Sequence, residues 1–309
     1  MTTILSDQDL RGRHVMPAAI RAVEAFLLAC AQGKAIAPPR HHVSFAQHGE
    51  LVFTIGGVSG DQPRAGFRVY DTFKGPEHTQ IVAVWSPNDA ELKGVVLGAF
   101  LGAIRTGAIG GVAIRHLSHP DAHNIGVLGS GLQARTQLAA AAAVRKLRTA
   151  RVYSRDAANR EAFAKTMQVE LDIDIQPVGT AQEAVHDADI VICATSSQSP
   201  VINARDLKPG AHVNTVGPKT IAGHELGRDI ADIARIIATD SVEQTRAYSS
   251  PFFLSDTSHE LRMVELSDLV AKTVPGRASE QEISLFCSVG LAGTEVAVAA
   301  ALLDHYKGA

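Results

Sequence analysis

The sequence predicts an α/β protein in which a doubly wound parallel sheet is joined to a smaller α+β domain. From residue 124 onward, short β-branched runs alternate with helical stretches at the spacing of parallel βαβ units. Runs such as Ile-Val-Ile-Cys-Ala at 190–194 are apolar throughout, as a sheet covered by helices on both faces requires. A length of 309 residues is enough for two domains of ordinary size.

Composition narrows the class of partner. The formal charge is −3 and no basic block is present, so we expect no nucleic-acid partner and instead a small, largely uncharged ligand or cofactor. Cys30, Cys193 and Cys287 are odd in number and far apart in apolar runs, which predicts reduced thiols in a cytoplasmic protein. The first residues have no apolar stretch long enough for a signal peptide, so export is not expected.

The first third of the chain predicts one helix followed by an antiparallel sheet. Residues 17–32 should be helical, because Pro17 suits a first helical turn, apolar side chains share one face and Gly33 can end the helix. The β-branched and aromatic runs that follow are separated by turn residues. We expect strands at 51–55, 66–73, 79–86 and 95–99.

Residues 94–114 are apolar except for Arg105, but the central charge and repeated glycines argue against a membrane span. We interpret them as the end of a buried strand followed by a helix at 101–117, and expect no membrane partner. Ser-His-Pro-Asp at 118–121 breaks the helix and marks a domain boundary.

The second domain should contain six parallel strands, with a helix at 132–147 whose five consecutive alanines favour helix formation. After residue 239 the pattern indicates loops, then a final helix that begins near Leu291 and returns to the first domain. The predicted domains are therefore 1–118 with 291–309, and 119–290. The expected strands are 124–128, 150–154, 173–178, 190–194, 212–216 and 236–239.

The clearest functional motif is Gly129-x-Gly131-x-x-Ala134, which follows a predicted strand and opens a predicted helix. Glycines at these positions permit a tight turn and let backbone N–H groups approach a pyrophosphate, which the helix N-terminus then stabilises. This context predicts a Rossmann-type dinucleotide-binding domain.

The end of the second strand bears on which dinucleotide binds. An acidic side chain there would bond the ribose 2′-hydroxyl of NAD, whereas Ser154 and Arg155 offer a hydroxyl and a guanidinium suited to the 2′-phosphate of NADP. NADP is therefore favoured over NAD. The alternative is that Arg155 is solvated and that Asp156 either binds the ribose or caps the next helix.

Three arginines are candidates for binding an anion. Arg105 lies in an apolar, glycine-rich run, where a guanidinium is costly to bury unless an anion pairs with it. A substrate carboxylate or a cofactor phosphate could be this anion, and an internal acid is the alternative. Arg40 and Arg68 could also meet a carboxylate, although the polar face of the strand that carries Arg68 could equally be exposed. No metal-ligand spacing and no Gly-x-Ser-x-Gly motif occurs.

Five motifs, in order and spacing, resemble the ornithine cyclodeaminase and mu-crystallin family along nearly the whole chain. They are Ala-Pro-Pro-Arg at 37–40, Ala-Ile-Arg-Thr-Gly-Ala at 103–108, Ile-Gly-Val-Leu-Gly-Ser-Gly-Leu-Gln-Ala at 125–134, Asn-Thr-Val-Gly at 214–217 with His-Glu-Leu at 224–226, and Leu-Phe-Cys-Ser-Val-Gly-Leu-Ala-Gly-Thr-Glu at 285–295.

The resemblance implies a homodimer whose substrate-binding and dimerisation domain combines the N-terminal third with the last helix, beside an NAD(P) domain, with the active site between the two. It implies that Arg40 and Arg105 hold the α-carboxylate of an amino or imino acid. Cofactor-binding positions carried over from the family motifs are Ser130, Gln133 and Ala134 for the pyrophosphate, Thr195, Val216, Gly217, Ser288, Val289 and Gly290 for the nicotinamide, and Thr79 and Thr106.

Two positions depart from the family pattern. Arg68 replaces a lysine that could shuttle a proton, and a guanidinium remains charged, so we expect Arg68 to bind rather than to catalyse proton transfer. Lys219 stands where the cyclodeaminase branch has a catalytic aspartate. It could meet a second carboxylate, donate a proton to an imine nitrogen or point to solvent.

The resemblance and the residues together predict an NAD(P)H-dependent oxidoreductase acting on the C–N bond of a small α-amino or α-imino acid. Arg40, Arg68 and Arg105 would neutralise the carboxylate and orient the α-carbon, with Lys219 as a further catalytic candidate. Two alternatives stay open, namely a cyclodeaminase-type lyase that recycles NAD and a non-catalytic NADP-binding protein like a crystallin.

Overall fold

The computed structural model describes residues 2–12, 15–75, 78–248 and 250–307. The chain divides into two compact units, which we term unit 1 (1–108 with 291–309) and unit 2 (109–290). The division falls within helix α2 (Phe100–Leu117), whereas the sequence places the boundary after this helix. None of the described helices is long and apolar enough to cross a membrane.

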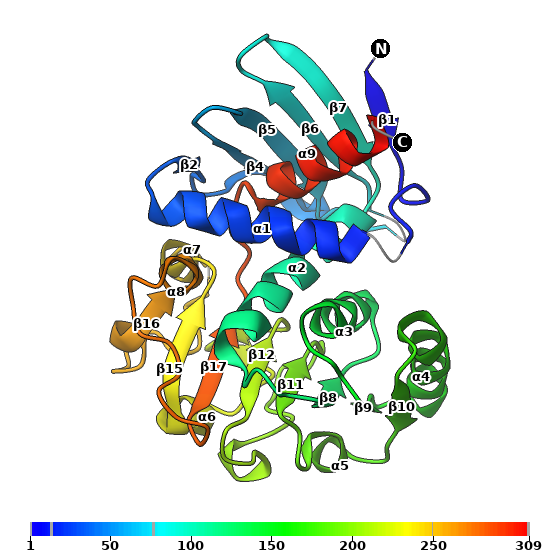
Figure 1. Cartoon of the computed structure of the whole chain (residues 1–309), viewed down its shortest axis with the longest axis vertical. Coiled ribbons are helices and arrows are strands. Elements are labelled where there is room, and N and C mark those ends of the chain that lie inside the picture. The colour runs from blue at the N-terminus through cyan, green and yellow to red at the C-terminus, as the bar shows by residue number, and fades with distance from the viewer. Residues whose placement is uncertain (1, 13–14, 76–77, 249, 308–309) are drawn as a thin grey trace. The chain divides into compact units, whose positions relative to one another are not determined.

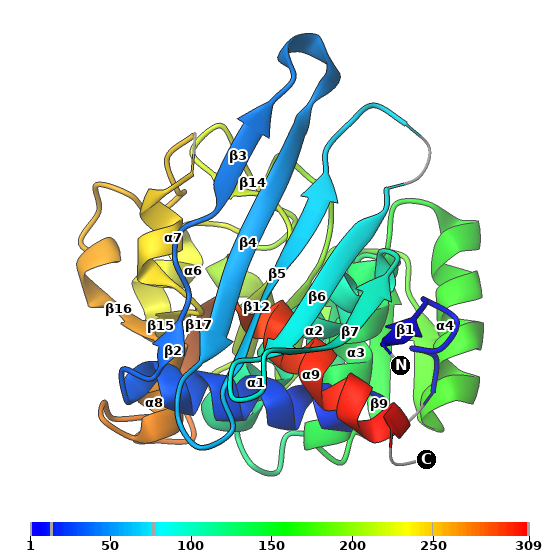
Figure 2. The ribbon, with the colours of Figure 1, turned by 90° about the horizontal axis from the view of Figure 1, so that it is seen from above.

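Unit 1 is built on a mixed sheet in the order β1-β7-β6-β5-β4-β2, with β3 also paired to β4. Strands β4 to β7 form the expected antiparallel meander, and β1 adds a parallel edge to β7 (Figure 2). The predicted antiparallel sheet is therefore confirmed. The strands are β1 Thr3–Leu5, β2 Ala35–Ile36, β3 His41–Ser44, β4 Glu50–Val58, β5 Arg64–Asp71, β6 Gln80–Ser86 and β7 Glu91–Leu97.

Helix α9 (Thr294–Lys307) covers one face of this sheet and packs against helix α1 (Val15–Ala31). Its approach requires glycine on both sides. A Cβ on Gly56 would lie 2.2 Å from the Cα of Gly293, and Gly293 itself has a φ of +83°. The first turn of α9 can therefore lie directly against β4.

Among the described residues, the larger sheet of unit 2 has eight strands, all parallel, in the order β10-β9-β8-β11-β12-β17-β15-β16. The order reverses between β8 and β11, where doubly wound folds bind dinucleotides. The six predicted strands are confirmed with ends shifted by a few residues. The strands are β8 Asn124–Leu128, β9 Thr149–Tyr153, β10 Asp174–Pro177, β11 Ile190–Cys193, β12 His212–Thr215, β15 Ala234–Thr239, β16 Met263–Glu265 and β17 Ile283–Cys287.

Two further strands of this sheet, β16 and β17, were not predicted. Residues 283–287 were expected to belong to no strand because the sheet seemed complete, yet β17 inserts between β12 and β15. A short apolar run just before a helix does not distinguish a strand from a helix by periodicity. The final helix correspondingly begins at Thr294 rather than near Leu291.

Helices cover both faces of this parallel sheet, with α3 and α5 on opposite sides in Figure 1. Alternation along β11 shows why its run is wholly apolar, since Ile190 and Ile192 join one core and Val191 and Cys193 the other. The remaining elements of unit 2 are α3 Leu132–Val144, α4 Ala157–Leu171, α5 Ala181–Val185, α6 Asp229–Ile233, α7 Val242–Arg246, α8 Leu266–Ala271, β13 Lys219–Thr220 and β14 Gly223–His224.

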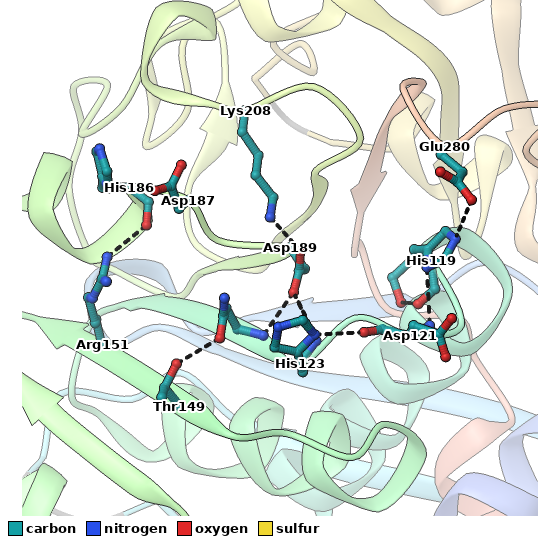
Figure 3. Close-up of polar contacts among 12 residues, drawn as sticks. His119, Asp121, His123, Thr149, Arg151, His186, Asp187, Asp189, Lys208 and Glu280 are labelled. Atoms are coloured by element: carbon teal, nitrogen blue, oxygen red, sulfur yellow. Dashed lines mark hydrogen bonds and ion pairs between the residues drawn. The ribbon is translucent and has the colours of Figure 1, made fainter.

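A carboxylate ties the strands together at the edge formed by their amino ends. Asp189, just before β11, accepts hydrogen bonds from the backbone N–H groups of His123 and Asn124 at 2.9 Å each, and from Lys208 (Figure 3). Burial opposes ionisation of Asp189, but these donors outweigh it and lower its pKa. The amino ends of β8 and β11 are thus fixed to one another.

Candidate cofactor and carboxylate sites

The loop between β8 and α3 has two glycines with different roles. Gly129 has a φ of +112°, and a Cβ there would lie 2.3 Å from the carbonyl oxygen of Ala194, so the fold itself requires glycine. At Gly131 a Cβ would meet no atom within 4 Å, so the missing side chain leaves open space in front of α3. No side chain caps α3 at Gly131. This space and helix terminus fit a pyrophosphate.

A cavity of about 850 Å³ opens beside this loop. It lies at the carboxyl ends of β8, β9 and β11, which is the switch point of the sheet. Many of the predicted cofactor positions meet around it. Its lining includes Gly129, Ser130, Gly131, Gln133, Ser154, Arg155 and Thr195.

In the turn after β9, Asp156 has one of the two roles that the sequence leaves open for it. Its side chain caps α4 by accepting a hydrogen bond from the N–H of Asn159 at 2.8 Å. Ser154 donates its hydroxyl to the carbonyl of Asp156, and Arg160 donates to the carbonyl of Ser154. The guanidinium of Arg155 is left exposed on the rim of the cavity.

The other predicted nicotinamide positions lie on loops at the carboxyl edge of β12 and β17. Two buried carboxylates bond these loops: Glu225 bonds Val216 and Gly217, and Asp240 bonds Val289 and Gly290. In the sequence Glu225 stands out only as part of the His-Glu-Leu motif, and Asp240 was not predicted to contribute. The position of Glu225 shortly after the Asn-Thr-Val-Gly motif was the available signal for this residue.

Like the positions on the loops after β12 and β17, three further predicted cofactor positions do not line this cavity. Ala134, in the first turn of α3, is fully buried in the core that α3 covers. Thr106 and Thr79 belong to unit 1, where Thr106 donates its hydroxyl to the carbonyl of Gly102 and Thr79 is exposed before β6.

In unit 1, two of the predicted arginines share one buried carboxylate. Glu295, in the first turn of α9, lies 2.8 Å from Nη1 of Arg68 and 3.1 Å from Nη2 of Arg105 through the same oxygen, Oε1. All three side chains are buried. The internal acid that the sequence leaves as an alternative for Arg105 is therefore present, and it comes from a segment 190 residues later that was not predicted to contribute.

Arg68 has further contacts besides the one with Glu295. Its Nε donates to Oε1 of Gln80 at 2.9 Å, and the guanidinium lies 4.1 Å from the ring centre of Tyr70. The possibility that this face of β5 is exposed is wrong, because Arg68 is the most buried residue of the strand. It points toward the face that α9 covers, where Glu295 requires a cation.

The arginines of this cluster favour the ionised form of Glu295. Burial disfavours the ionised form of Glu295, but Arg105 and Arg68 outweigh that cost and lower its pKa, with a further contribution from Arg40. The cluster thus brings two buried guanidinium groups together beside one carboxylate. Such a cluster can attract a further carboxylate from a ligand.

Lys219 is 5% exposed, so the alternative in which it points to solvent is wrong. Its ammonium group donates to the carbonyl oxygen of Gly217. Burial lowers the pKa of Lys219, and the nearby carboxylate of Glu225 opposes this shift.

The chain matches the model of the ornithine cyclodeaminase/mu-crystallin family over residues 1–309. Among curated proteins, it is 28% identical to a Delta(1)-pyrroline-2-carboxylate reductase of Bacillus cereus, over 88% of this chain and 86% of the relative. It is also similar to the structure of Thermococcus litoralis Delta(1)-pyrroline-2-carboxylate reductase in complex with NADH and L-proline, with a TM-score of 0.86, 29% identity and coverage of 99% and 97% of the two chains.

An archaeal alanine dehydrogenase dimer with bound NAD has a TM-score of 0.85, with 26% identity over 99% of this chain and 96% of the other. These similarities extend through both units, including the glycine loop and the segments that carry the buried arginines. The chain belongs to the ornithine cyclodeaminase/mu-crystallin family.

Proposed function

We propose that this chain is an NAD(P)H-dependent oxidoreductase that interconverts a small α-imino acid and the corresponding α-amino acid. The observation that carries the proposal is the buried cluster of Arg68, Arg105 and Glu295, because it brings two guanidinium groups together at one buried place, an arrangement that suits an α-carboxylate. The relative from Thermococcus litoralis, which was solved with NADH and L-proline, supports both ligand classes.

In this proposal the chain binds and orients its ligands, and the nicotinamide supplies the hydride. Arg40, Arg68 and Arg105 neutralise the substrate carboxylate and fix the α-carbon. The imine carbon gains the hydride while its nitrogen gains a proton. At the other ligand, Ser130 and Gln133 border the pyrophosphate, whose charge the N-terminus of α3 stabilises.

The runner-up, a cyclodeaminase, needs a carboxylate to move protons during ring closure. Lys219 stands in its place, and its ammonium is buried and committed to the carbonyl of Gly217. The environment of this position therefore favours the reductase.

We expect the chain to oxidise NADPH or NADH when a cyclic imino acid such as a pyrroline carboxylate is added, measured as loss of nicotinamide absorbance. With ornithine and NAD it should release neither proline nor ammonia at a comparable rate, because Lys219 stands at the position where a cyclodeaminase needs a carboxylate. Sustained proline formation from ornithine would support the lyase instead. Binding of cofactor and imino acid without turnover would support the non-catalytic alternative.

We further propose that NADP(H) is the preferred cofactor. Asp156 caps α4 through one carboxylate oxygen, and Arg155 lies exposed on the rim of the cavity. A charge-assisted bond to a 2′-phosphate contributes about 1.5 to 3 kcal/mol, which corresponds to tenfold discrimination or more.

NADPH should therefore bind at least about tenfold more tightly than NADH in a fluorescence titration, and Arg155→Ala should reduce this ratio most of the way to one. Arg151→Ala is the matched control, since Arg151 lies on the same strand but donates to the carbonyl of His186 at the amino edge (Figure 3). Equal dissociation constants for the two cofactors in the wild-type chain would contradict the preference.

Replacing Arg105 by Ala removes a buried partner of the substrate carboxylate, which should cost about 2 to 5 kcal/mol of transition-state stabilisation. We therefore expect kcat/KM for the imino acid to fall roughly thirtyfold to several thousandfold. Glu295 keeps its contact with Arg68, so we expect the variant to fold and to bind the cofactor normally. Arg64→Ala is the control, because Arg64 is a partly exposed arginine on the same strand as Arg68 and pairs with Asp304 of α9. The kcat/KM of this variant should stay near that of the wild type. Wild-type efficiency in Arg105→Ala would remove this arginine from the substrate site.

We also propose that the chain forms a homodimer through the sheet face of unit 1 that α9 does not cover. This face is apolar although exposed, since Ile55, Ile81 and Leu97 are 54%, 41% and 38% exposed. Their strand partners place them on one surface, with Ile55 opposite Phe67 and Ile81 opposite both Val69 and Leu97. A contiguous exposed apolar face marks an interaction surface.

In sedimentation velocity the wild-type chain should be a dimer, and Ile81→Glu should convert it to monomer because a carboxylate would be buried against apolar surface. Val169→Glu introduces the same charge at a highly exposed position of α4 and should leave the dimer intact. A monomeric wild type, or a dimer that persists in Ile81→Glu, would exclude this face as the interface.

A further inference from the structure

Three loops at the carboxyl edge of unit 2 contain the predicted nicotinamide positions. They follow β11, β12 and β17, which are neighbours in the sheet. Their positions depend on two buried carboxylates that follow β14 and β15 in the chain.

Glu225 connects the first two loops. It is fully buried, and its Oε2 accepts hydrogen bonds from the N–H of Thr195 at 2.8 Å and from the hydroxyl of the same residue at 2.7 Å. Its Oε1 accepts from the hydroxyl of Thr215 at 2.7 Å and from the N–H groups of Val216 at 3.2 Å and Gly217 at 2.6 Å. One side chain thus fixes the ends of β11 and β12 relative to each other.

Gly217 and Lys219 complete the arrangement around the carboxylate of Glu225. A Cβ on Gly217 would lie 2.4 Å from Oε2 of Glu225, so only glycine allows the loop to approach this closely. The carbonyl oxygen of Gly217 accepts from the ammonium of Lys219. The peptide groups on both sides of the Gly217 Cα are therefore held by charged side chains.

Asp240 fixes the backbone of the loop after β17. It is 1% exposed, and its two oxygens accept from the N–H groups of Val289 at 2.7 Å and Gly290 at 2.8 Å. Successive N–H groups bound by one carboxylate hold a turn in a fixed orientation, and bonds to a charged acceptor are about twice as strong as neutral ones.

We propose that Glu225 and Asp240 are positioning residues that set the nicotinamide end of the cofactor site by fixing the loops after β11, β12 and β17, with Lys219 completing the arrangement at Gly217. This inference rests on the proposed cofactor binding and extends it to residues that do not themselves line the cavity. A displacement of about 1 Å at a reacting centre can lower a rate by about a hundredfold.

Replacing Glu225 by Gln tests the proposal because the two residues have nearly the same shape. A glutamine side chain has one acceptor oxygen and an NH₂ group, so one set of donors must face that NH₂. The hydroxyls of Thr195 and Thr215 can turn and accept, but backbone N–H groups cannot. Either the loop after β11 or the loop after β12 must therefore move.

The measurement compares two probes, namely NADPH and the fragment 2′-phospho-ADP-ribose, which retains the adenosine and pyrophosphate but lacks the nicotinamide. In Glu225→Gln and Asp240→Asn, NADPH should bind at least tenfold more weakly while the fragment stays within about twofold of wild type. Asp189→Asn is the control, because Asp189 bonds the strands at the amino edge and should lower the melting temperature without changing the ratio of the two affinities.

Thr215→Val keeps the test decisive if Glu225→Gln fails to fold, since it removes one donor to Glu225 at equal volume and should give a smaller change in the same direction. An unchanged ratio of the two affinities, whether both fall equally or neither changes, would overturn the positioning role. Failure of the wild-type chain to bind NADPH or NADH would overturn the proposed function itself, which separates the two outcomes.

Discussion

An ionised carboxylate that is removed from water must be met by several donors, and this requirement organises the functional parts of both units. Glu225 and Asp240 are met mainly by backbone N–H groups, whereas Glu295 is met by the guanidinium groups of two arginines. The first arrangement fixes backbone and the second concentrates positive charge. Asp189 repeats the first at the opposite edge of the parallel sheet.

Glycines make these contacts sterically possible. Gly217 lets a loop lie against the carboxylate of Glu225, and the pair Gly56 and Gly293 lets the first turn of α9 bring Glu295 to the covered face of β5. Gly131 differs from both, because in the described part of the chain no atom beyond its immediate neighbours lies within 4 Å of where its Cβ would be. Packing within the chain therefore requires glycine at positions 217, 56 and 293 but not at position 131.

Much of this could be predicted because it depends on local pattern. Strands with apolar runs, the glycine turn before α3 and the need of Arg105 for an anion were all evident from neighbouring residues. The identity of that anion was not, because Glu295 lies 190 positions away and reaches Arg105 only through the packing of α9. β17 was missed for a related reason, since its place between β12 and β15 is decided by the sheet and not by its own five residues.

The arginine at position 68, where the family usually has a lysine, has a physical consequence for the chemistry. The planar guanidinium donates to Gln80 and Glu295 at once while its flat face stacks on Tyr70, whereas a lysine ammonium has no planar face to stack. A guanidinium is also a poor proton donor in catalysis. In the proposed reaction Arg68 therefore binds and does not transfer a proton, so the proton that an imine nitrogen gains comes from solvent or from another group of the site.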